Sequence, residues 1–311
     1  MSQVKNTPDA ASAALIAVTG PATLQAMPRT HPDLPALPAV RTIGLMQPMT
    51  WLVLAWRDMA RAGWVSFAHG LALALFGAAI LAVGHHQFWL LAGALSGFLV
   101  VAPVLATSLY ALSRALERGE PAAWGVVLKT WLHWQNHHVH KWGSDYWCML
   151  QFGALLAFAA TGWVLTSAAL ITLLAPVPIA TPLDFLRHVV LAREGWLFEI
   201  WLALGSLMAA PIFASSVVAM PLLLDRRATL RQAVLTSWQA VLCNPLPMAF
   251  WAALILGFTL LGLGSLLLGL VAVMPMLGHA SWHAYRDLVD ASSLPERDAA
   301  AMAARNIGVA P

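Results

Sequence analysis

Long apolar blocks are the feature of this sequence that most restricts its fold. A helix needs about 20 apolar residues to cross the roughly 30 Å of hydrocarbon in a bilayer. Charged residues make up only 10% of the chain, against roughly 25% in ordinary soluble domains. Four blocks are long enough and carry no acidic or basic side chain except Glu199: Trp64 to Gly84, Phe88 to Leu112, Leu150 to Leu174 and Trp196 to Leu224. The sequence therefore predicts an integral membrane protein.

A fifth apolar block, from Asn244 to about His283, is too long for one spanning helix and long enough for two. The segment Gly262-Leu263-Gly264-Ser265 is the natural place for a turn between them. We therefore predict an all-α membrane protein with six transmembrane helices.

An internal repeat gives the same count. Ala102 to Ser108 recurs as Ala210 to Ser216, and a fainter copy runs from Met274 to Ala280. The repeat predicts three transmembrane hairpins, each preceded by an interfacial amphipathic helix, as at Thr50 to Asp58 and Val126 to Trp134. The second helix of each hairpin carries a proline, which removes a backbone hydrogen bond and bends a helix. The predicted kinks are Pro103, Pro211 and Pro275.

The positions of lysine and arginine predict the orientation, because short cytoplasmic loops carry them in excess. With six helices and the N-terminus inside, only Arg187 and Arg193 lie outside. A five-helix topology would instead export Arg286, Arg297 and Arg305. We therefore expect a bacterial inner-membrane protein with both termini in the cytoplasm. Its net charge of +3 is a topology signal and indicates no nucleic-acid partner.

Composition divides the chain into three parts. Residues 1–40 are rich in Ala, Pro and Thr and are expected to form a flexible cytoplasmic tail. Residues 41–290 form the six-helix transmembrane domain. Residues 291–311 form a second loose cytoplasmic tail.

Hydroxyl residues about one turn beyond the prolines have two interpretations. They can occupy backbone groups that the prolines free, in which case the kinks only let the hairpins pack together. Alternatively, they line a shared cavity between kinked helices, as in transporters with broken helices. The cavity-lining candidates are Thr107, Ser108, Ser215, Ser216 and His279.

Histidines are the candidate metal or haem ligands. His69, His279 and His283 lie near the cytoplasmic ends of the first and sixth helices, where ionisable groups are often functional. A second group occupies the loop from His133 to His140, but no acidic or cysteine ligand accompanies it. Hydration from the cytoplasmic side and headgroup contact are the simpler explanations for both groups. We therefore expect no cofactor, with haem or metal kept as the alternative.

Common catalytic motifs are absent from the sequence. It has no Walker loop, dinucleotide fingerprint, Gly-x-Ser-x-Gly elbow or His-Glu-x-x-His zinc motif. Cys148 and Cys243 both fall at cytoplasmic helix ends and are expected to be reduced thiols. These observations favour a protein that is not an enzyme.

Several segments together resemble a family. They are Trp51 to Asp58, Ser96 to Pro103, Ser113 to Gly119, Pro221 to Arg226 and Gly278 to Leu288. They are similar to the signature segments of a proteobacterial family of predicted integral membrane proteins, catalogued as a domain of unknown function, over roughly residues 41–290. Some members of that family carry the label of cytochrome c oxidase subunits. The resemblance implies a membrane topology and no established activity.

Three functional hypotheses follow. The first is a non-enzymatic membrane component that acts through packing with lipid, a membrane protein partner or another copy of itself. The second is a small transporter or channel with a cavity between the kinked helices. The third is a haem-binding or metal-binding accessory protein of a respiratory oxidase.

Overall fold

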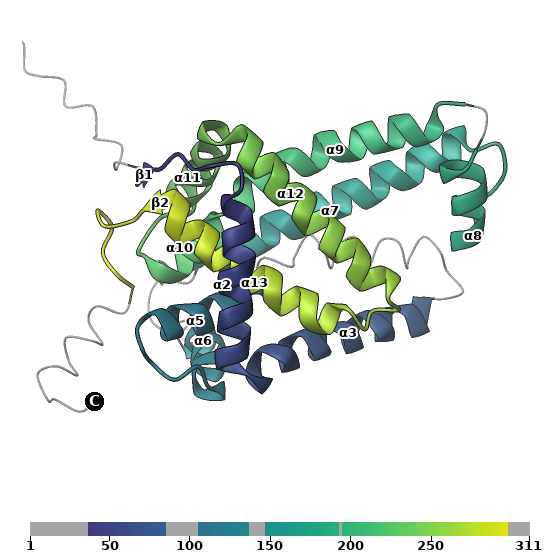
Figure 1. The fold of residues 1–311 in the computed structure, drawn as a ribbon. Coiled ribbons are helices and arrows are strands. Elements are labelled where there is room, and N and C mark those ends of the chain that lie inside the picture. The colour runs from purple at the N-terminus through teal and green to yellow at the C-terminus, as the bar shows by residue number, and fades with distance from the viewer. Residues whose placement is uncertain (1–36, 85–104, 137–146, 193–194, 298–311) are drawn as a thin grey trace, which may run out of the picture. The chain divides into compact units, whose positions relative to one another are not determined.

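A computed structural model describes residues 37–84, 105–136, 147–192 and 195–297, all within one compact unit, Leu37–Pro311. Most of the predicted Phe88 to Leu112 helix, Pro103, the histidines at 137, 138 and 140, and most of both predicted tails lie outside these residues. The described part is almost entirely helical (Figure 1). Its helices are α2 (Gln47–Ala62), α3 (Trp64–Gly84), α5 (Thr107–Glu117), α6 (Trp124–Asn136), α7 (Trp147–Leu174), α8 (Pro182–Phe185), η2 (Leu186–Val190), α9 (Leu197–Ser216), α10 (Ala219–Asp225), α11 (Leu230–Cys243), α12 (Pro245–Gly264) and α13 (Leu270–Leu288).

Four helical segments of the described residues are long and apolar enough to cross a membrane. They are Trp64–Ala82, Cys148–Leu174, Leu197–Asp225 and Pro245–Gly264. Three of them coincide with blocks chosen from the sequence, and the fourth is the first half of the last block. The prediction of a helical membrane protein is therefore confirmed, with four candidate spans among the described residues.

The last apolar block forms two helices, α12 and α13, and their connection lies slightly beyond the predicted turn. Helix α12 continues through Gly264, and the chain turns over residues 265–269. The Ser265 hydroxyl donates to the Gly262 carbonyl (2.9 Å) and accepts from the Gly269 amide (2.7 Å), which satisfies backbone groups at the turn. Leu266 and Leu267 adopt positive φ angles there. Leu267 is buried against α3 and α13, and this packing offsets the strain of that conformation.

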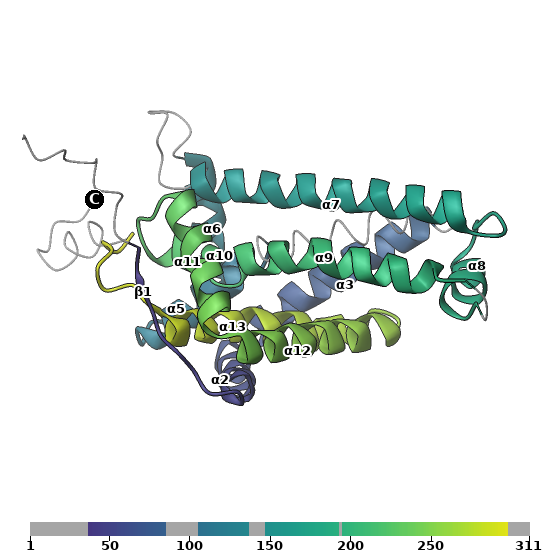
Figure 2. The same cartoon turned by 90° about the horizontal axis from the view of Figure 1, so that it is seen from above.

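Helices form where the sequence predicted interfacial helices. α2 contains the Thr50 to Asp58 segment and α6 contains the Val126 to Trp134 segment. α11 starts with a capping box between Thr229 and Gln232. Seen from above, α7, α9, α12 and α3 run in the same general direction, and α2, α6, α10 and α11 lie towards one end of them (Figure 2).

A two-stranded antiparallel pairing joins the first and last described segments. β1 (Ala39–Val40) pairs with β2 (Val289–Asp290), with Ala39 opposite Asp290. Beyond the strands, the Arg41 amide donates to the Leu288 carbonyl (2.8 Å) and the Ile43 amide to the Asn244 side chain (2.8 Å). Residues just before α2, just after α13 and at the end of α11 therefore lie together.

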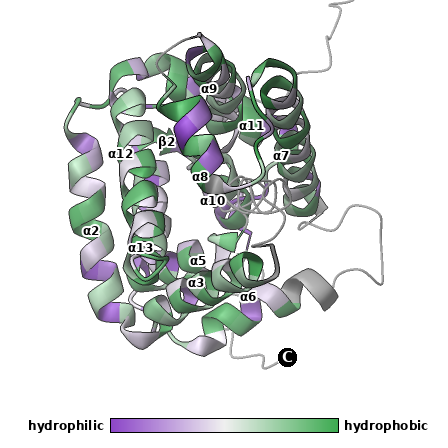
Figure 3. Ribbon diagram, turned by 90° about the vertical axis from the view of Figure 1, so that its right-hand side faces the viewer, coloured by the Kyte–Doolittle hydropathy of each residue, from purple (hydrophilic) through white to green (hydrophobic). Residues whose placement is uncertain are grey.

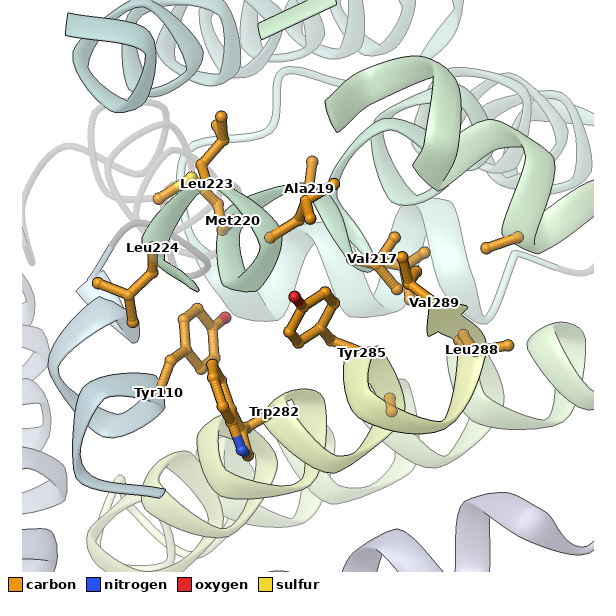
Figure 4. Close-up of a cluster of buried hydrophobic side chains, with 14 of the residues drawn as sticks. Tyr110, Val217, Ala219, Met220, Leu223, Leu224, Trp282, Tyr285, Leu288 and Val289 are labelled. Atoms are coloured by element: carbon orange, nitrogen blue, oxygen red, sulfur yellow. The ribbon is translucent and has the colours of Figure 1, made fainter. Parts of the chain in front are cut away.

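The main buried cluster lies at the end of the long helices where α10 and α11 are found. Tyr110 of α5, Met220 of α10 and Trp282 and Tyr285 of α13 pack together there (Figure 4). By contrast, α7 and α9 are coloured mainly as hydrophobic (Figure 3), and the long helices leave large apolar side chains exposed. Phe158 and Leu173 of α7 are each 80% exposed. Apolar side chains directed away from the protein are what a helix needs in contact with lipid.

Candidate functional site

Helix α13 places two histidines at the centre of the polar contacts. His279 and His283 are one turn apart and share a face, because residues four positions apart on a helix lie one above the other. Two glycines allow neighbouring helices to approach this helix closely. A Cβ added at Gly278 would lie 2.5 Å from Leu109 Cδ1 of α5, and one added at Gly70 of α3 would overlap the Val271 carbonyl of α13. The small residues therefore bring the polar groups of α3 and α5 within reach of α13.

Five side chains from four helices form a continuous hydrogen-bonded network. His279 Nε2 lies 2.8 Å from the Ser66 hydroxyl of α3, and His279 Nδ1 lies 2.7 Å from the Ser113 hydroxyl of α5. The Ser113 hydroxyl also donates to Asp58 Oδ2 of α2 (2.6 Å). His283 Nε2 contacts the same Asp58 oxygen at 2.9 Å. We call this set, Ser66, His279, Ser113, Asp58 and His283, the histidine network.

The donors and acceptors of the histidine network have a consistent direction. An ionised Asp58 can only accept, so the Ser113 hydroxyl gives it a hydrogen. The Ser113 oxygen is then free to accept from His279 Nδ1–H, which leaves Nε2 of a neutral ring as an acceptor for the Ser66 hydroxyl. Each bond therefore points towards Asp58.

The environment of Asp58 stabilises its charged form. Burial by itself raises the pKa of this carboxyl group. Hydrogen bonds from His283 and Ser113, together with the positive charge that His283 can carry, outweigh burial and lower the pKa below its ordinary value of 3.8. Asp58 is only 6% exposed, so its carboxylate has little contact with solvent. Ser113 and His283 donate hydrogen bonds to it instead.

An open cavity of about 330 Å³ borders the network. Asp58, Ser113 and His283 line it together with charged side chains from α2, α5 and α13. The lining residues are Leu54, Arg57, Asp58, Arg61, Ser113, Leu116, Glu117, His283 and Arg286.

A second polar centre surrounds Asp225, the last residue of α10. Its carboxylate accepts from the Tyr285 hydroxyl (2.9 Å) and from Arg226 Nε (3.0 Å). Arg114 and Arg118 of α5 approach it at 4.0 and 3.9 Å. The carboxylate is only 4% exposed, so these partners compensate a buried charge.

The structure separates the residues predicted to line one cavity. His279 belongs to the histidine network, whereas Ser215 accepts from Trp238 of α11 (2.9 Å) and Ser216 donates to the Phe213 carbonyl (3.3 Å). Thr107 and Ser108 are completely buried at the start of α5. The described hydrogen bonds therefore give His279, Ser215 and Ser216 different partners.

The histidines predicted as metal or haem ligands are engaged elsewhere. Both ring nitrogens of His279 face serine hydroxyls, and His69 Nδ1 lies 2.7 Å from the Val65 carbonyl. The His69 ring stacks on Trp124, with ring centroids 6.0 Å apart. Within the described ranges, no group of three His, Cys, Asp or Glu side chains could hold a metal ion.

Sequence reasoning missed the acidic centres of both polar sites. Asp58 lies on the same face of α2 as Trp51, Ala55 and Met59, all buried. A single carboxylate on the buried face of an amphipathic helix is a recognisable signal, because such a charge needs a partner. Ser66 and Ser113 gave no comparable signal, since their partners are far away in the sequence, and so are the Tyr285, Arg114 and Arg118 partners of Asp225.

The signature segments that suggested the family come together around these polar sites. The 51–58, 113–119, 221–226 and 278–288 segments supply Asp58, Ser113, Asp225 and both histidines. Residues 90–225 match the family model "Predicted integral membrane protein (DUF2189)". This match confirms the resemblance over that range, and the DUF2189 description gives no activity. No curated protein and no solved structure matches the chain.

Proposed function

We propose that this protein is a six-span component of a bacterial inner membrane with both termini in the cytoplasm. Its spans form three hairpins, each preceded by an interfacial helix, and it acts without catalysis by packing against lipid or a membrane protein partner. The four candidate spans and the DUF2189 match support the membrane assignment.

The observation that carries the topology is the set of contacts between segments that flank different spans. Asp58 precedes α3 and contacts Ser113, which follows the second apolar block. Arg118 precedes α7 and lies 3.9 Å from Asp225, at the end of the α9–α10 span. Asn244, just before α12, donates to the Arg41 carbonyl (3.0 Å), and Arg41 in turn reaches the end of α13. Each contact supports a pair of spans that leaves one membrane face and returns to it.

The outward apolar surface supports packing as the mode of action. Phe158, Leu165 and Leu173 of α7 and Leu256, Leu260 and Leu261 of α12 are exposed in the isolated chain. Lipid tails or the spans of a partner would cover them. The polar groups, in contrast, gather at one end of the spans and satisfy one another.

Cysteine accessibility in intact cells tests the topology. Single cysteines would be introduced as Gln87→Cys, Val177→Cys and Leu266→Cys in a chain lacking Cys148 and Cys243, with the native Cys243 alone as the cytoplasmic control. An impermeant thiol reagent should label the three new sites in spheroplasts and Cys243 only after lysis. Labelling of Cys243 in intact spheroplasts, or protection of all three new sites, would contradict the six-span arrangement.

Transport is the second candidate, and the histidine network favours it. Chains of acidic and histidine side chains inside membrane proteins often serve as proton relays. The network leads from Ser66 in the α3 span to the cavity beside His283. Proton flux in liposomes tests this idea: protein-dependent flux that disappears in His279→Ala supports transport, and the absence of flux favours the packing role.

A further inference from the structure

Helix α2 carries three separate stripes. Trp51, Ala55, Asp58 and Ala62 lie on its buried face. Met49, Val53 and Trp56 follow at helical spacing on a second face and remain exposed, with Trp56 60% exposed. Arg57 and Arg61 form the third stripe, one turn apart, between the other two. A helix with one apolar face open and arginines beside it lies in the membrane interface, at the level of the lipid headgroups.

The arginine stripe opens onto the cavity of the histidine network. Arg57 and Arg61 line that cavity together with Arg286 of α13. Leu54 and Leu116 provide its apolar wall. Its volume of about 330 Å³ falls within the range of small-molecule pockets, about 300 to 1,000 Å³.

The acidic residues of the cavity already have internal partners. Asp58 accepts from Ser113 and lies against His283. Glu117 accepts from Arg286 Nε (3.0 Å) through one oxygen and from Trp282 Nε1 (2.9 Å) through the other. Neither carboxylate therefore depends on Arg57 or Arg61 for a partner.

Arg57 and Arg61 keep their charge available for a ligand. Among the described residues, no acidic side chain forms an ion pair with either of them. Both are exposed and line the cavity. Guanidinium groups offer planar pairs of donors that match the oxygens of a phosphate.

We propose that this cavity binds the phosphodiester headgroup of an anionic membrane phospholipid. Arg57 and Arg61 hold the phosphate oxygens, and Leu54 and Leu116 contact the glycerol end of the lipid. The exposed stripe of Met49, Val53 and Trp56 lies beside the acyl chains. This inference rests on the proposed interfacial position of α2, but binding of a soluble lipid analogue can be measured without a bilayer.

The test titrates the full-length protein in neutral detergent with three probes. They are dioctanoyl phosphatidylglycerol, dioctanoyl phosphatidylcholine and inorganic phosphate, and tryptophan fluorescence reports binding. The cavity variant is Arg57→Gln/Arg61→Gln, and the control is Arg231→Gln, which removes an exposed arginine of α11 away from the cavity. Both changes affect exposed side chains, and circular dichroism checks that the variants fold.

We expect phosphatidylglycerol to bind and the cavity variant to lose about 30-fold in affinity, because each arginine near an anionic lipid contributes a factor of about five. The Arg231→Gln control should keep the parental affinity. Equal affinity in the cavity variant would overturn the proposal. Phosphatidylcholine binding as tightly as phosphatidylglycerol would also overturn it, and so would inorganic phosphate binding as tightly, because the ligand would then be a soluble anion. A failed topology experiment together with arginine-dependent lipid binding would overturn the six-span proposal and keep the site.

Discussion

His283 Nε2 lies 2.9 Å from Asp58 Oδ2, although 225 positions separate the two residues in the sequence. This contact joins α2 to α13, the last helix of the described residues. Ser113 connects α5 to the same carboxylate oxygen. Asp58 is therefore the point at which the start, middle and end of the described chain meet.

Removing the charge of Asp58 should destabilise the fold. In Asp58→Asn, Ser113 and His283 both lose a charged acceptor, at a cost of about 1–3 kcal/mol in the free energy of unfolding. Thermal or detergent-induced unfolding of the purified protein measures the loss. Glu120→Gln, which changes an exposed carboxylate beyond α5, should alter stability little. Equal effects in the two variants would show that Asp58 has no special role.

The stability should also depend on pH through Asp58. Its folded-state pKa is below the ordinary value of 3.8, so the unfolded chain takes up the proton first as pH falls. The contribution of Asp58 is therefore fully present above about pH 4 and is lost as pH falls through the folded-state pKa. Unfolding measured between pH 6 and pH 3 should show a smaller loss in Asp58→Asn than in the parent. Parallel curves would contradict this expectation.

Two aspartates provide a comparison of buried and exposed ion pairs. Asp225→Asn leaves Arg114, Arg118 and Arg226 without their shared buried acid and should cost about 3 kcal/mol. Asp290→Asn removes an exposed partner of Arg41 and should cost much less, because water screens that pair. The difference in unfolding free energy between these variants is the quantity to measure, and a larger loss in Asp290→Asn would be inconsistent with the structure.

The contact between α3 and α13 should tolerate no side chain at position 70. A Cβ there would overlap the Val271 carbonyl, so Gly70→Ala must push the helices apart at a cost of about 1–3 kcal/mol. Gly257→Ala is the matched control in α12, since no atom lies within 4 Å of its added Cβ. This control should be neutral or slightly stabilising, because alanine favours a helix over glycine. Unfolding curves in one detergent compare the two changes.

The histidine contacts give an expectation for cofactor content. Both ring nitrogens of His279 already have hydrogen-bonding partners, so His279→Ala should leave the visible spectrum and the metal content of the purified protein unchanged. Elemental analysis and absorption spectra of the parent and the variant test this. A stoichiometric haem or metal that disappears in the variant would restore the oxidase-accessory hypothesis.

Local features of the fold could be predicted from the sequence, because they depend on nearby residues. The charge-free block Trp64 to Gly84 coincides with α3. The long last block divides into two helices, although the turn lies beyond Gly264 because Ser265 satisfies the backbone at residues 262 and 269.

The polar sites could not be predicted in the same way. The spacing of His279 and His283 showed that they share a face but not what that face meets. Their partners Ser66, Ser113 and Asp58 lie in other helices, and their contacts depend on close approaches at Gly70 and Gly278. Sequence periodicity describes one helix at a time and contains no information on such approaches.

The pairing of β1 with β2 constrains the number of membrane crossings by parity alone. Val40 is hydrogen-bonded opposite Val289, so both residues occupy the same side of the bilayer. A chain that leaves one side and returns to it crosses an even number of times, whatever the hydropathy of its segments and wherever its arginines lie. The pairing thus favours an even number of spans, such as the proposed six, over an odd number such as five. Gain or loss of a single span during evolution would move one terminus across the membrane and break the pairing. Gain or loss of a hairpin would keep both strands on the same side.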